Sequence, residues 1–69
     1  MELKWVDGFK IQVRTADREV VLSANREGLL SLAGHLIVLA DEVPGSHIHL
    51  DEHNSLEDHS DELIIERVN

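Results

Sequence analysis

Cysteine is absent from this 69-residue chain, so neither a disulfide nor a thiolate metal site can hold the fold together. Long apolar runs are absent too, and the longest, residues 36–40, is far too short to span a membrane. The first residues also lack the basic start and apolar stretch of a secretory leader. We therefore expect a cytoplasmic protein, a location that the lack of cysteine permits.

Basic residues are nearly missing from the last third of the chain. Residues 41–69 contain nine carboxylates and one base, Arg67, whereas residues 1–40 contain five acids and five bases, so the last third carries the whole formal net charge of −8. A charge of this sign repels nucleic acids and anionic lipids. We therefore expect no nucleic-acid or membrane partner, and we expect a basic protein to be attracted.

Sequence motifs typical of catalysis are missing as well. Serine, histidine and aspartate are present, but no nucleophile elbow, oxyanion loop or glycine-rich phosphate loop surrounds them. A two-layer domain of this length also has little room for a substrate cavity of ordinary size. The sequence therefore predicts a protein that is not an enzyme and needs no cofactor.

The sequence does contain the pattern of one small α+β domain over residues 1–69. Asp7-Gly8 lies between two alternating segments, residues 3–6 and 9–14, and Asp-Gly in that position predicts a β-hairpin. Further strands are expected at residues 19–22, 46–52 and 62–68. A helix is expected over residues 24–42, with Ser23 as its N-cap.

The apolar residues of this helix are expected to pack on one antiparallel sheet of four to five strands. The result would be a two-layer sandwich of order ββ(β)αββ, with one sheet face left open. The expected buried stripe recurs at helical spacing and consists of Leu29, Leu32, Ala33, Leu36, Ile37 and Ala40. Gly34 lies within the helix and would permit close approach to the sheet or to another helix.

His47, His49 and Asp51 alternate with apolar residues and are expected on the open sheet face. Two histidines and a carboxylate at alternate strand positions can ligate a metal, so these three residues form a candidate metal site. The same pattern is also typical of a solvated strand face whose imidazoles bond to nearby carboxylates. A third interpretation is a homo-oligomeric structural protein, such as a homodimer in which open faces or edge strands meet.

Four segments of the chain resemble the bacterial immunity protein 32 (Imm32) family of polymorphic toxin systems. They are residues 23–33 (SANREGLLSLA), 44–52 (PGSHIHLDE), 55–58 (SLED) and 62–66 (ELIIE), and the similarity covers roughly residues 19–67. The chain departs from this pattern at His59, where a small residue such as glycine would suit the turn. The resemblance implies a cytosolic antitoxin that binds and neutralises a cognate toxin domain.

Many such toxin domains are nucleases with basic clefts, which an acidic surface could occupy in place of nucleic acid. Charge would speed association, and an apolar anchor would prolong the complex. Leu56, the only apolar residue of its acidic loop, is the candidate anchor, although it could equally be tucked onto the core. The candidate contact residues are His47, His49, Asp51, Glu52, Leu56, Glu57, Asp58 and Asp61.

Overall fold

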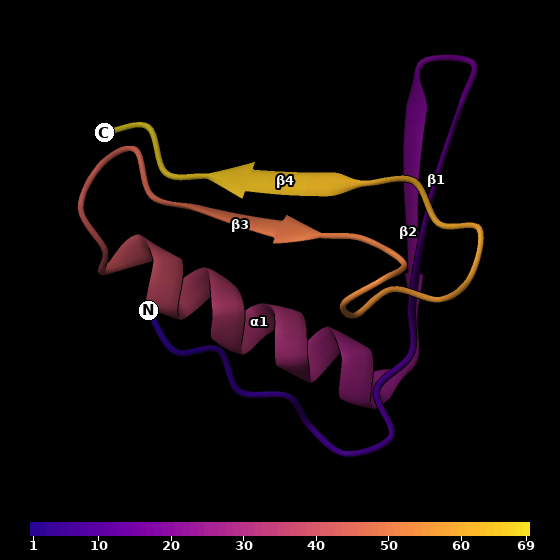
Figure 1. Ribbon diagram of the computed structural model, residues 1–69, viewed down its shortest axis with the longest axis horizontal. Coiled ribbons are helices and arrows are strands. Elements are labelled where there is room, and N and C mark those ends of the chain that lie inside the picture. Colours follow the sequence, from indigo (N-terminus) through magenta and orange to yellow (C-terminus); the bar gives the residue numbers. More distant parts are fainter.

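The computed structural model describes all residues 1–69 and confirms the α+β class. Its elements are β1 (Ile11–Ala16), β2 (Glu19–Ala24), α1 (Arg26–Ala40), β3 (His47–Leu50) and β4 (Leu63–Glu66) (Figure 1). This is the four-strand form of the expected order. No helix in the structure has the length and apolarity that crossing a bilayer requires.

The strands form two separate sheets, so the expected single sheet of four to five strands is not observed. β1 pairs antiparallel with β2, and β3 pairs antiparallel with β4. Figure 1 shows the β1–β2 hairpin standing across the end of the β3–β4 pair. The other edge of β1 is occupied by the loop before β4, because the N–H groups of Glu57 and Asp61 donate to the carbonyls of Ile11 and Val13 at 2.8 Å each.

The expected first strand at residues 3–6 is not formed. Asp7-Gly8 does make a turn, in which the Phe9 N–H donates to the Val6 carbonyl at 3.1 Å and Gly8 has a φ of +83°. The chain before this turn runs beside α1 instead of pairing with β1 (Figure 1). A tight hairpin does exist one segment later, between β1 and β2, where Asp17 and Arg18 both have positive φ.

Helix α1 is shorter at both ends than expected, and its N-cap is Asn25, not Ser23. The Asn25 Oδ1 accepts from the Gly28 N–H at 2.8 Å and from the Lys10 N–H at 3.0 Å, so one side chain caps the helix and ties it to the residue before β1. A Cβ at Gly28 would lie 2.6 Å from the Lys10 carbonyl oxygen. Glycine therefore allows the start of α1 to pack closely on the chain entering β1.

The core is small, with seven buried hydrophobic side chains from β1, α1, β3 and the following loop. The alternation expected for β1 and β3 is confirmed, and the cluster consists of Ile11, Val13, Leu32, Leu39, Ile48, Leu50 and Leu56.

Of the six residues of the expected helix stripe, only Leu32 is buried, so the stripe is wrong at its other five positions. Leu29, Leu36 and Ile37 are 54%, 49% and 67% exposed, whereas Ser31 and His35 are each only 1% exposed.

The N-terminal segment explains why polar residues of α1 are buried. This segment has no strand partner, so its backbone groups need partners from the helix. The Ser31 Oγ accepts from the Val6 N–H at 2.9 Å, and the His35 Nε2 lies 3.0 Å from the Lys4 carbonyl oxygen. The His35 ring also meets Trp5 edge-on, with centroids 4.2 Å apart. His35 is thus a structural residue of the interior rather than the boundary residue of an amphipathic helix.

Candidate partner-binding surface

The acidic surface begins in a tight turn that follows β3. The Asp51 N–H donates to the Asn54 Oδ1 at 3.1 Å, and the Asn54 Nδ2 donates to the His49 carbonyl at 3.1 Å. The Asp51 Oδ1 accepts from the His53 N–H at 2.9 Å, while the Asp51 carbonyl accepts from the Leu56 N–H at 2.9 Å. These bonds fix the Asp51 carboxylate at the end of β3.

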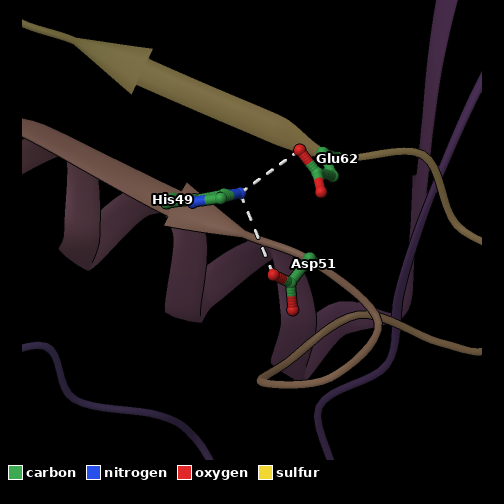
Figure 2. A group of neighbouring side chains, drawn as sticks. All are labelled: His49, Asp51 and Glu62. Atoms are coloured by element: carbon green, nitrogen blue, oxygen red, sulfur yellow. Dashed lines mark ion pairs between the residues drawn. The ribbon is translucent and has the colours of Figure 1, made fainter.

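Three side chains from this region converge, as Figure 2 shows. The His49 Nε2 lies 3.8 Å from the Asp51 Oδ2 and 3.5 Å from the Glu62 Oε2. The register pairs Leu50 with Leu63, so residues 51 and 62 are the next opposed positions and point to the same face. The side chain of Asp51 is 22% exposed, that of His49 47% and that of Glu62 68%, so the cluster is open to solvent.

The chemistry of this cluster allows two uses. A protonated His49 would form ion pairs with both carboxylates. One imidazole and two carboxylates, with ligand atoms within 4.8 Å of one another, could also hold a divalent cation. Ligand atoms of a tetrahedral zinc site are about 3.3 Å apart, so modest side-chain rotations would close the cluster around an ion.

The structure changes the ligand set expected from the sequence. His49 and Asp51 are brought together as expected, but the third member is Glu62 and not His47. His47 lies at the start of β3, in a shallow hollow shared with Met1 and Pro44. Sequence spacing could not identify Glu62, because its place depends on the β3–β4 register, which spacing along one strand does not reveal.

The loop of residues 57–61 continues the acidic surface from the cluster to the edge of β1. The Asp61 Oδ2 accepts from the Thr15 N–H at 2.8 Å and from the Thr15 Oγ1 at 2.9 Å, and the Glu52 Oε2 accepts from the His59 N–H at 2.9 Å. Two of the candidate contact acids, Glu52 and Asp61, therefore also stabilise the loop.

The remaining candidate contact residues divide clearly by burial. Glu57 and Asp58 are exposed, and no hydrogen bond or ion pair of their carboxylates is seen. Leu56 is only 5% exposed and belongs to the hydrophobic core. Of the two roles left open for Leu56, the structure shows the core position, so this residue is not an accessible anchor for a partner.

No lysine or arginine neutralises this surface by a direct ion pair. The four ion pairs in the structure use the N-terminal amine, His49 and His53 as their basic members. Arg67, the one base in the last third of the chain, donates instead to the carbonyls of Glu42 and Asn69. The acidic surface, defined here as Asp51, Glu52, Glu57, Asp58, Asp61 and Glu62 with His49, therefore keeps its negative charge exposed.

Comparison with known proteins agrees with the segments that carry the resemblance. Searches among curated proteins and among solved structures found no match. The model of one protein family, described as immunity protein 32, matches residues 19–68, from the start of β2 to the end of β4 and beyond. The matched region contains the whole acidic surface and most of the chain, and it shows that this protein belongs to the Imm32 family of immunity proteins.

Proposed function

We propose that this protein is a cytoplasmic antitoxin that binds a basic toxin domain through its acidic surface. The observation that carries the proposal is a group of neighbouring carboxylates, all exposed except the half-buried Asp51, with no lysine or arginine in ion-pair distance. The immunity family supplies the biological role, namely neutralising a cognate toxin. The carboxylates supply the chemistry, because a basic cleft shaped for nucleic acid attracts a fixed array of negative charges.

Rigidity favours this surface over a flexible acidic tail. Asp51 and Asp61 are fixed by hydrogen bonds to the chain, and Leu56 anchors the loop between them in the core. A preorganised array loses little conformational entropy on binding, so more of its electrostatic attraction remains as affinity. Inhibition would then follow from occupying the toxin's substrate cleft, with no chemical step on the immunity protein.

The experiment measures the rate of association with the cognate toxin domain, by stopped-flow or surface plasmon resonance. The double variant Asp58→Lys with Glu62→Lys avoids the carboxylates that hold the loop, and it should slow association at least about tenfold at low salt. The single variants Asp58→Lys and Glu62→Lys should each slow association less than the double variant. Glu19→Lys, at an exposed acid at the start of β2, makes the same charge change as each single variant and should have a much smaller effect. Unchanged association of the double variant would refute this surface as the binding site.

A divalent-cation module is the second candidate function, favoured by the His49–Asp51–Glu62 cluster. Titration with Zn²⁺ or Ni²⁺ should then shift or broaden the NMR signals of His49 ahead of those of His53 and His59. The Glu62→Gln variant should weaken metal affinity about tenfold or more, because it removes one of the three ligands and one of the two carboxylate charges of the cluster. A response equal at all exposed histidines, or absent at micromolar metal, would rule this function out.

A further inference from the structure

Helix α1 presents an apolar face to solvent that the monomer does not use. From Gly28 to Ala40 it contains no acidic or basic residue apart from His35, which is buried. The exposed side chains on the opposite face include Leu29, Leu30, Leu36 and Ile37, each at least 44% exposed. In an isolated domain this face should be polar.

Gly34, at the middle of this face, is a second and independent sign. A Cβ at Gly34 would meet nothing within 4 Å, so no packing inside the monomer requires glycine there. Glycine inside a helix is destabilising relative to alanine. Small residues on an exposed helix face allow the backbone of another helix to approach closely. Ala33 and Gly34 are adjacent small residues of this kind.

The arrangement of residues around Ala33 and Gly34 is self-complementary. Leu30 and Ile37 lie at equal distances on either side of this pair, and all four share one face of the helix. A two-fold axis between residues 33 and 34 would set Leu30 of one helix opposite Ile37 of an antiparallel copy. The small residues of both helices would then meet at the crossing point. Isologous interfaces require such self-complementarity, and a surface for an unrelated partner does not.

Charge fits the same arrangement at both ends. Arg26 lies four residues before Leu30, Asp41 lies four residues after Ile37, and both are exposed with no ion pair in the monomer. In the antiparallel pair each Arg26 would face Asp41 of the other copy. This accounts for an acid at a helix C-terminus, where it opposes the macrodipole of its own helix.

We propose that this protein forms a two-fold symmetric homodimer in which two α1 helices pack antiparallel through Leu30, Ala33, Gly34 and Ile37, with Arg26 paired to Asp41 of the second copy. Helix α1 has 15 residues, or a length of about 22 Å, so the interface lies at the small end of specific interfaces. We expect a dimer dissociation constant of about 1–100 µM. The acidic surface belongs to β3 and the loop between β3 and β4, so both copies keep it free.

Sedimentation equilibrium of the full chain at 0.15 M salt, over about 5 µM to 1 mM, tests the dimer. Ile37→Glu should raise the dimer dissociation constant at least about a hundredfold, because each dimer would bury two charges. Ile64→Glu is the matched control, since Ile64 is 59% exposed on β4, and it should leave the constant within about threefold. Monomer at every concentration, or a dimer indifferent to Ile37→Glu, would overturn the proposal.

Charge exchange tests the antiparallel pairing itself and does not depend on how Ile37→Glu folds. Arg26→Asp and Asp41→Arg should each weaken the dimer about five- to tenfold by placing like charges together twice per dimer. Each single change should nevertheless raise the thermal stability of the monomer. Arg26→Asp places a negative charge at the positive N-terminal end of the helix dipole, and Asp41→Arg places a positive charge at its negative C-terminal end. The double variant Arg26→Asp with Asp41→Arg should restore association to within about threefold of the original. A double variant that dimerises as weakly as the single variants would overturn the Arg26–Asp41 pairing. Such a result would not bear on the proposed binding of a toxin, which uses the acidic surface.

Discussion

Two glycines of the same helix experience opposite surroundings. Gly28→Ala should lower the free energy of unfolding by about 1–2 kcal/mol, because the clash with the Lys10 carbonyl outweighs the better helix propensity of alanine. Gly34→Ala, whose Cβ would meet open space, should raise it by up to about 1 kcal/mol. Urea unfolding in dilute, low-salt solution measures both values on the monomer. Equal effects of the two substitutions would contradict the close packing of Gly28 on the chain entering β1.

His59 is a strained residue that the sequence pattern already marked as unusual. Its φ is +67°, in the left-handed region that glycine adopts at no steric cost. His59→Gly should therefore raise the free energy of unfolding by about 0.5–1 kcal/mol, because glycine relieves the steric strain of this conformation. The N–H of residue 59 can still donate to Glu52 in this variant. His53→Gly is the control, since His53 is an exposed loop residue without positive φ, and it should lower stability. Thermal melts of the two variants should move in opposite directions.

At the scale of elements, the strands were more predictable than the helix face. Alternation in β1 and β3 depends on burial of one strand face, and Ile11, Val13, Ile48 and Leu50 are buried as expected. Apolar spacing in α1 reports only that one face is apolar, not which neighbour covers it. Here the segment before Asp7-Gly8 covers the side of the helix that carries Ser31 and His35. Backbone groups of this segment, about 25 to 31 residues away in sequence, hydrogen-bond to these two side chains.

The acidic loop could be located from sequence, but its attachment could not. Asp61 appears in the sequence as one more solvated carboxylate, and only the tertiary structure brings it to Thr15. Likewise Glu62 joins His49 because of a register that no local pattern specifies. The candidate surface could therefore be predicted from the sequence. Only the three-dimensional structure distinguishes the acids that hold the loop, such as Asp61, from those without a bonding partner, such as Asp58.

This split predicts different consequences for two neighbouring acids. Asp61→Ala should cost about 1–2 kcal/mol of unfolding free energy, because both donors of Thr15 lose their acceptor. Asp58→Ala should change it by less than about 0.5 kcal/mol. A double-mutant cycle of Asp61→Ala with Thr15→Val, followed by urea unfolding, should give a coupling of about 1 kcal/mol. Additive effects would show that Asp61 does not hold the loop through Thr15.

At the scale of the whole molecule, the core is too small to account for the apolar content. Ten of 69 residues are buried, and twelve large hydrophobic side chains remain exposed. Domains of this length bury a smaller fraction of their surface than larger domains do, and association is one common way in which they gain stability. The α1 face supplies an apolar surface for association, and the β3–β4 side supplies a charged one.

These two surfaces should respond to salt in opposite directions. Two copies that each carry a formal charge of −8 repel one another, and the repulsion acts over about 30 Å at 0.01 M salt but only about 8 Å at 0.15 M. The two Arg26–Asp41 pairs of the proposed dimer are exposed and contribute only about 0–1 kcal/mol each, so screening of the repulsion should dominate. Raising salt from 0.01 to 0.3 M should thus strengthen the homodimer about tenfold or more, and it should slow association with a basic toxin domain by a similar factor. Sedimentation at several salt concentrations measures the first and stopped-flow mixing the second. A homodimer that weakens with salt would mean that ion pairs, not the apolar face of α1, hold the two copies together.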